Sequence, residues 1–211
     1  MLEGIEVLYH SSIRIEKEGK VIYFDPYNIE GEPKDADIIF CTHSHYDHFS
    51  KEDILKLKNK DTIIVGTVDL EIQIRELGFE DSQKLLVLPN KKYSISNLVV
   101  ETVPSYNINK EFHKKEYDWV GYVITLEGTR YYIAGDTDVN DDNRKVKCDV
   151  AFLPVGGKYT MTATEAAGLA NTIKPKIAVP THYAGIVGEL ANGKEFEHML
   201  NPNIKCVLYI K

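Results

Sequence analysis

The sequence has few cysteines, no long apolar run and less positive than negative charge. Its three cysteines, Cys41, Cys148 and Cys206, form no close pair and no Cys-x-x-Cys motif, so we expect free thiols in a reducing compartment rather than a disulfide framework. No segment approaches the length and hydrophobicity of a membrane span, and residues 1–9 have neither a basic flank nor a long apolar core. These absences predict a cytoplasmic protein that is not associated with a membrane.

The charge balance also argues against a nucleic-acid partner. The chain has 25 Lys and Arg residues against 32 Asp and Glu residues, a formal net charge of -7, whereas proteins that bind the nucleic-acid backbone normally carry a basic patch. A hydrophobic fraction of 43% and a charged fraction of 27% are ordinary for a globular protein. We therefore expect one well-buried domain over residues 1–211, a small-molecule substrate and no nucleic acid, and we leave a homo-oligomer open.

Histidine is concentrated in one segment, directly after the apolar residues 38–40. His43 and His45 are two positions apart, so on an extended backbone their side chains point the same way and can chelate one ion. Asp47 and His48 can serve a second ion once the chain has turned. Because imidazole nitrogens and carboxylate oxygens suit zinc and other borderline divalent metals, we interpret residues 42–48 as a metal site rather than a polar surface loop.

Strands and helices alternate along both halves of the chain, which predicts an α/β fold. Period-two apolar patterns predict strands, turn residues predict hairpins, and Ser or Thr followed three residues later by an acid predicts a helix start. The main expectations are a meander over residues 5–9, 13–15 and 21–24, a helix after Ser50, a hairpin turn at 127–129, a helix capped by Thr162 and Glu165, and a closing strand over 204–210.

Two further candidate ligands follow apolar strands. Asp136 comes after residues 130–134 and His182 after residues 177–179, positions where open α/β sheets place functional residues. For Asp136 the alternative is a turn aspartate, but beside the histidine segment we favour a metal ligand.

Other residues have two interpretations each. His10 and Asp25 either lie near the metals or form structural hydrogen bonds. Lys158 and Tyr159 either face the pocket or are a solvated lysine and a packing tyrosine. They follow Gly156-Gly157, a pair that predicts a backbone kept open for close approach.

The segment His43-Ser44-His45-Tyr46-Asp47-His48 resembles the His-x-His-x-Asp-His signature of the metallo-β-lactamase superfamily of hydrolases, and Gly135-Asp136 and His182 are similar to its later aspartate and final histidine. The segments at residues 8–12 and 25–26 resemble the corresponding segments of one compact, single-domain branch of this superfamily. That branch includes L-ascorbate-6-phosphate lactonase-like enzymes. The resemblance covers essentially the whole chain. It implies a four-layer αβ/βα sandwich, in which two mixed sheets carry helices on the outside.

The resemblance also implies a ligand set and a chemistry. It assigns His43 and His45 to one ion, Asp47, His48 and His182 to the other, and Asp136 to a bridge. Two divalent ions are expected, zinc first, with manganese, nickel or iron as alternatives. A shared water of lowered pKa would give the hydroxide that attacks a small ester, lactone or phosphodiester. Asp47 and His48 are expected to be catalytic, with Lys158, Tyr159 or His10 contacting the developing anion.

The chain departs from the family pattern in one place. The family usually has a further histidine just after the strand at residues 98–103, where this chain has Ser105-Tyr106-Asn107. His113 is the nearest substitute, and a solvated loop histidine is the alternative. Two other functions remain open at this point: a di-iron redox protein on the same fold, and a non-catalytic protein that binds a metal or metabolite. Antibiotic hydrolysis is set aside, because true β-lactamases commonly have cysteine where Asp136 stands.

Overall fold

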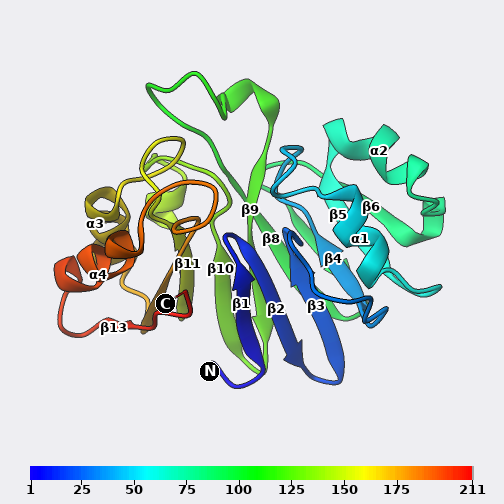
Figure 1. Ribbon diagram of the computed structural model, residues 1–211, viewed down its shortest axis with the longest axis horizontal. Helices are drawn as coiled ribbons and strands as arrows, with labels where there is room; N and C mark the ends of the chain where they lie inside the picture. The colour runs from blue at the N-terminus through cyan, green and yellow to red at the C-terminus, as the bar shows by residue number, and fades with distance from the viewer. Residues whose placement is uncertain (211) are drawn as a thin grey trace. The chain divides into compact units, whose positions relative to one another are not determined.

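The computed structural model describes residues 1–210, which form two compact units. One unit comprises residues 2–88, and the other runs from Pro89 onward together with Met1. Each unit contains one mixed β-sheet and two α-helices (Figure 1). Among the described residues, no helix is long and apolar enough to cross a membrane. The expectation of one hydrolase domain over residues 1–211 concerns both units together and stays a prediction.

The unit of residues 2–88 is built on a six-stranded sheet in the order β1-β2-β3-β4-β5-β6. Strands β1 to β3 pair antiparallel, which confirms the predicted meander, and β3 to β6 pair parallel. The Ser50 hydroxyl accepts a hydrogen bond from Asp53 N and so caps α1, as predicted. The elements are β1 (Ile5–Tyr9), β2 (Ser12–Lys17), β3 (Lys20–Phe24), β4 (Ile38–Phe40), α1 (Lys51–Leu57), β5 (Ile63–Thr67), a 3₁₀ turn (Val68–Leu70), α2 (Glu71–Glu76), a second 3₁₀ turn (Asp81–Gln83) and β6 (Lys84–Val87).

Strand β4 positions the histidine segment. All three of its residues are buried, as is typical of a parallel strand in the interior of a sheet. It pairs with β3 so that Phe24 lies beside Phe40, and Asp25 N donates a hydrogen bond of 2.8 Å to Phe40 O. The carboxyl ends of the two strands therefore meet at one edge, which brings Asp25 to the start of the segment 42–48.

The second unit is built on a seven-stranded sheet in the order β13-β12-β11-β10-β9-β8-β7. Strands β7 to β10 pair antiparallel and β10 to β13 pair parallel, an arrangement similar to that of the first sheet. The elements are β7 (Lys92–Ile95), β8 (Leu98–Pro104), a 3₁₀ turn (Lys115–Tyr117), β9 (Val120–Leu126), β10 (Thr129–Ile133), a 3₁₀ turn (Asn143–Lys145), β11 (Val150–Pro154), α3 (Ala163–Ile173), β12 (Ile177–Thr181), α4 (Leu190–Met199) and β13 (Lys205–Cys206).

Local sequence explains two of these connections. Leu126 pairs with Thr129, and the intervening Glu127 and Gly128 have φ angles of 49° and 70°, the left-handed values that a two-residue hairpin turn requires. Thr162 and Glu165 form a reciprocal capping box at the start of α3. The predicted hairpin and the predicted helix start are both confirmed.

Two edge strands differ from the sequence expectation. The closing strand, expected over residues 204–210, is the two-residue β13 at the sheet edge, where only Ile177 and Ala178 of β12 pair with it. Strand β7, at the opposite edge, was not predicted. Its residues alternate polar and apolar, with Tyr93 half-buried and Ile95 buried, but the alternation covers only these four residues.

The register of the second sheet gathers three strand ends at one edge. Ile133 of β10 lies beside Phe152 of β11, which lies beside Val179 of β12. Because these strands are parallel, their carboxyl ends emerge together, as is typical of ligand sites in α/β sheets. The loops that follow carry Asp136, Gly156 and His182.

Candidate functional site

Residues 2–88 bring five predicted site residues into one cluster. His43, His45, Asp47 and His48 come from the segment after β4, and His10 comes from the turn between β1 and β2. Asp47 Oδ2 lies 3.5 Å from His10 Nε2 and 3.5 Å from His48 Nε2, while His43 Nε2 lies 3.1 Å from His45 Nδ1. His45 is half-buried and the other four are buried. The histidine segment is therefore not a solvated surface loop.

Asp25 fixes the orientation of His48. Its Oδ2 lies 2.7 Å from His48 Nδ1, and both side chains are buried. A carboxylate accepts hydrogen bonds, so His48 Nδ1 carries the donated proton. His48 Nε2 then keeps its lone pair, which is the form of imidazole that binds a metal. The sequence left two interpretations of Asp25 open, a structural hydrogen-bonding residue or a neighbour of the metals. The contact with His48 makes it a structural partner that borders the candidate site.

Thr42 orients His43 in a similar way. Thr42 N and Thr42 Oγ1 donate hydrogen bonds of 2.7 and 2.8 Å to the two oxygens of Asp25. Because the hydroxyl proton is given to Asp25, Thr42 Oγ1 accepts from His43 Nδ1, 3.0 Å away. His43 Nε2 therefore also keeps a lone pair. Sequence reasoning missed this role of Thr42, since only the pairing of β3 with β4 brings Asp25 to it.

Cys41 directly precedes the histidine segment. Its side chain is fully buried in a hydrophobic cluster with Ile39 and Ile54, and burial raises the pKa of its thiol well above the ordinary value. The thiol therefore stays protonated at neutral pH.

The second unit brings Asp136, His182 and His113 together. His182 Nε2 lies 3.0 Å and His113 Nε2 3.3 Å from the same oxygen, Asp136 Oδ2. All three side chains are buried. Two imidazole nitrogens and a carboxylate oxygen are ligand types that zinc and similar divalent ions prefer. The interpretation of His113 as a solvated loop histidine is therefore wrong.

Gly156 leaves the space that His182 needs. A Cβ atom at this position would lie 2.2 Å from His182 O, closer than real Cβ atoms approach, and 3.3 Å from His182 Nδ1, a tight contact. Gly157 follows with a φ of 82°, a left-handed value that favours glycine. The close approach predicted from the paired glycines is confirmed.

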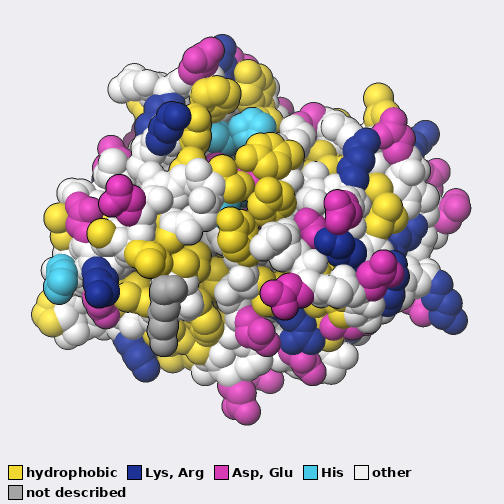
Figure 2. Space-filling model, in the orientation of Figure 1, with side chains coloured by type: hydrophobic (Ala, Val, Ile, Leu, Met, Phe, Trp, Pro, Cys, Tyr) yellow, Lys and Arg dark blue, Asp and Glu magenta, His cyan; other side chains and the backbone are white. Residues whose placement is uncertain are grey.

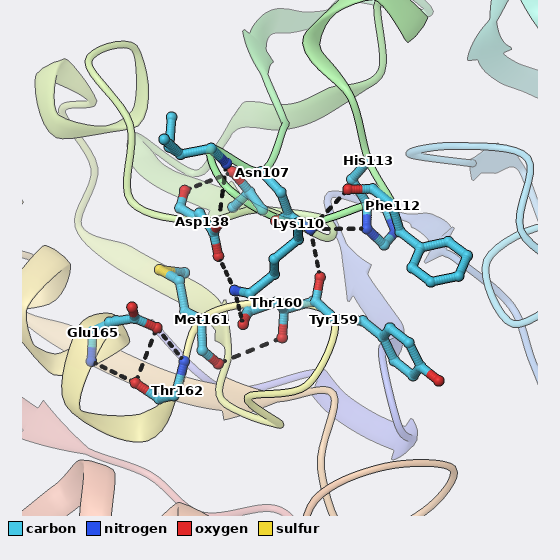
Figure 3. Close-up of polar contacts among 12 residues, drawn as sticks. Asn107, Lys110, Phe112, His113, Asp138, Tyr159, Thr160, Met161, Thr162 and Glu165 are labelled. Atoms are coloured by element: carbon cyan, nitrogen blue, oxygen red, sulfur yellow. Dashed lines mark hydrogen bonds and ion pairs between the residues drawn. The ribbon is translucent and has the colours of Figure 1, made fainter.

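Lys158 and Tyr159 continue this loop. Lys158 is exposed, with its Nζ 4.9 Å from the centre of the Tyr159 ring. Tyr159 meets Phe112 edge-on, with ring centres 5.3 Å apart, and its carbonyl accepts a 2.7 Å hydrogen bond from Asn107 Nδ2 (Figure 3). These contacts hold the 158–162 loop against residues 107–113. Contact of Lys158 and Tyr159 with a substrate stays a prediction.

Comparison with known proteins decides the family. The Beta-lactamase superfamily domain matches residues 4–182, and a UPF0173 metal-dependent hydrolase of Methanobrevibacter smithii is 30% identical, over 97% of this chain and 92% of the relative. The chain belongs to the UPF0173 metal-dependent hydrolases of the beta-lactamase superfamily. A UPF0173 relative in Methanosphaera stadtmanae is 32% identical, over 85% of this chain and 83% of its own length.

A solved structure confirms the fold. The crystal structure of a protein from Parabacteroides distasonis, named as a metal-dependent hydrolase, superimposes with a TM-score of 0.81 at 30% identity, covering 98% of this chain and 93% of that one. The predicted metallo-β-lactamase αβ/βα fold, with two mixed sheets, is therefore confirmed. The narrower resemblance to the L-ascorbate-6-phosphate lactonase-like branch stays a prediction.

Proposed function

We propose that this UPF0173 protein hydrolyses a small ester, lactone or phosphodiester with the help of divalent metal. The proposed ligands are His43, His45, Asp47, His48, Asp136 and His182. The observation that carries the proposal is the fixed orientation of His43 and His48, whose Nδ1 atoms are engaged by Thr42 and Asp25. The names of the curated relatives support hydrolysis, whereas the di-iron redox alternative has no such support from them.

The residues present fit a divalent ion. In the first unit, the Nε2 lone pair of His48 lies beside the carboxylate of Asp47, and that of His43 lies beside His45. In the second unit, the nitrogen of His182 approaches a buried carboxylate oxygen of Asp136. Burying this many polar atoms costs free energy unless each one is hydrogen-bonded, paired or coordinated to a metal. Histidine with carboxylate is the usual ligand set of zinc. We propose two zinc ions per chain, with manganese, nickel and iron as alternatives.

A bound divalent ion supplies Lewis acidity, which lowers the pKa of a water molecule and polarises a substrate oxygen. The protein residues supply orientation. Asp25 and Thr42 hold the two imidazoles in fixed tautomers, which removes the need to reorganise them during the reaction. Asp47, whose Oδ2 lies between His10 and His48, is proposed to bind an ion or to orient the attacking water. His10 is proposed to donate a hydrogen bond to the developing anion.

A small-molecule substrate agrees with the surface charge. On the face shown in Figure 2, acidic and basic side chains are interspersed, without a broad basic area. Such a surface gives little attraction to the phosphate backbone of a nucleic acid. We propose a small, locally recognised substrate for this reason.

The test is metal content and turnover in matched variants. Elemental analysis of protein purified without a chelating tag is expected to give close to two ions per chain, and a panel of lactones and phosphodiesters is expected to reveal turnover. His48→Ala and Asp136→Ala should each lower metal content and turnover, while His198→Ala, which removes an exposed histidine of α4, should change neither. Full metal content and turnover in both ligand variants would refute the proposal. Iron with a redox-dependent optical change and no hydrolysis would favour the di-iron alternative instead.

A further inference from the structure

The second unit contains a groove whose lining is strongly basic. The groove has a volume of about 520 Å³ and is lined by residues of β8, β9 and β10, by the start of β7 and by residues 142–147. Five of its lining side chains are basic and two are acidic, whereas the whole chain has a formal net charge of -7. A local excess of positive charge attracts anions, and this volume lies in the range typical of sites for small molecules.

Lys91 and Lys92 line the groove from the start of β7, where β8 holds their backbone. Lys91 N donates a 3.0 Å hydrogen bond to Thr102 Oγ1, and Thr102 N donates a 2.9 Å hydrogen bond to Lys91 O. Lys92 pairs with Glu101 of β8. Both lysines are exposed. The backbone of this segment is therefore fixed, while its two ammonium groups are accessible to a ligand.

Lys145 and Lys147 line the groove from the connection between β10 and β11. Arg130 Nε donates a 2.8 Å hydrogen bond to Lys147 O and so fixes this segment. Val146 lies between the two lysines in the chain and is buried in the hydrophobic core of the second unit. The lysines on either side of it are exposed. Two rigid segments therefore present two lysines each to one groove.

The two acidic residues of the groove already have cationic partners. Glu101 Oε1 accepts a 2.8 Å hydrogen bond from Arg130 Nη1, and this bond lowers the pKa of Glu101, with a smaller contribution from the charge of Lys92. Asp142 Oδ2 lies 3.8 Å from Nζ of Lys115, which is outside the groove lining. The net positive charge of the groove is therefore carried by its lysines.

Three valines give the groove an apolar base. Val123 and Val146 are buried members of the core of the second unit, and Val103 is half-buried against the same core. A ligand that covered these side chains would remove apolar surface from water, which stabilises a complex. The groove therefore suits a small molecule that combines an anionic group with an apolar or aromatic part.

We infer that this groove binds a small molecule with a diphosphate group, of the kind that a nucleoside diphosphate carries. Lysine ammonium groups act as point charges that can approach the oxygens of a tetrahedral phosphate from separate directions. Arg130, whose planar fork would match a carboxylate, is engaged by Glu101. The chain's net charge of -7 opposes a longer polyanion such as a nucleic acid. The groove lining lies outside the proposed metal-ligand set, so the inference is independent of the proposed hydrolysis.

The test uses ADP as the probe and the full chain as the receptor. Isothermal titration calorimetry should show saturable binding of ADP, with which inorganic pyrophosphate competes and adenosine does not. Lys145→Gln/Lys147→Gln should lower the affinity for ADP by at least about 10-fold, because hydrogen bonds to charged groups contribute this much. Lys194→Gln/Lys205→Gln is the matched control. It removes the same charge from exposed positions on α4 and β13, and it should bind ADP as the wild type does.

The outcomes separate the groove from the candidate metal site. Asp136→Ala should bind ADP as the wild type does, and failure of this inference leaves the proposed hydrolysis standing. Binding that is lost in Asp136→Ala but kept in Lys145→Gln/Lys147→Gln would place ADP at the metal site and overturn the inference. An equal loss in the control variant would mean that ADP responds to net charge alone, which also overturns it. The backbone amide signals of Lys91 and Val146 in the wild type should shift on addition of ADP, and unchanged signals or no binding would show the inference to be wrong.

Discussion

Replacing Gly156 by alanine should displace His182. The new Cβ would lie 2.2 Å from the His182 carbonyl oxygen, whereas ordinary contact begins at 3.4 Å, so one of the two backbones must move by roughly 1 Å. Neither can move easily, because Val155 N donates to Thr181 O at 3.0 Å and Pro154 pairs with Thr181. Overpacking of this kind typically costs about 1–3 kcal/mol in the free energy of unfolding.

The same displacement should weaken metal binding. Since His182 is a proposed ligand, a shift of about 1 Å is expected to lower metal affinity by about 10- to 100-fold, and to lower turnover by a similar factor. The assays are urea unfolding of the metal-free protein and chelator competition for the metal. Two separate losses are expected, one in stability and one in affinity.

Gly168→Ala is the matched control for this change. Gly168 lies on the exposed face of α3, and a Cβ there would have no neighbour within 4 Å. Because alanine is favoured over glycine inside a helix, this variant should be more stable by up to about 1 kcal/mol with unchanged metal affinity. If Gly156→Ala were as stable as the wild type and bound metal equally well, the argument from close approach would be refuted.

Three further substitutions test the contacts around the site. Asp25→Asn removes the carboxylate that holds His48 Nδ1 and should lower metal affinity by about 10- to 100-fold in chelator competition, while Asp61→Asn, at an exposed position, should not. Ser105→Ala removes the hydroxyl that bonds to the backbone carbonyls of Ala134 and Asp136 and should lower the free energy of unfolding by about 1–3 kcal/mol with metal stoichiometry unchanged; a loss of metal without a loss of stability would contradict this role of Ser105 in bracing the backbone at Asp136. Burial opposes ionisation of Asp53, but hydrogen bonds from Ser50, Lys56 and the backbone of residues 28 and 29 outweigh it and lower the pKa of Asp53. A lowered folded-state pKa stabilises the protein above the unfolded pKa of about 3.9, and this stabilisation is lost as the pH falls through the lower folded value. The wild type should therefore exceed Asp53→Asn in urea unfolding at pH 7 and have a smaller advantage at pH 3; an equal difference at both pH values would contradict the assignment.

The sequence by itself predicted the features that depend on neighbouring residues. The helix caps at Ser50 and Thr162 and the turn at Glu127-Gly128 follow from local backbone and side-chain chemistry, and all three occur in the structure. The ligand candidates in residues 43–48 could be found because they lie within six positions of the sequence. Asp136 and His182 could be found because parallel strands place their carboxyl ends at one edge.

Tertiary structure decided the contacts between residues that are far apart in the chain. Asp25 reaches Thr42 and His48 because β3 and β4 pair in parallel with Phe24 beside Phe40. His113 reaches Asp136 because hydrogen bonds from the side chains of Asn107 and Lys110 hold its loop against the sheet edge. That loop has no hydrophobic periodicity. Periodicity and spacing describe which way a side chain points along one element. They do not describe strand register or loop closure, which are fixed by pairing and hydrogen bonding between distant segments.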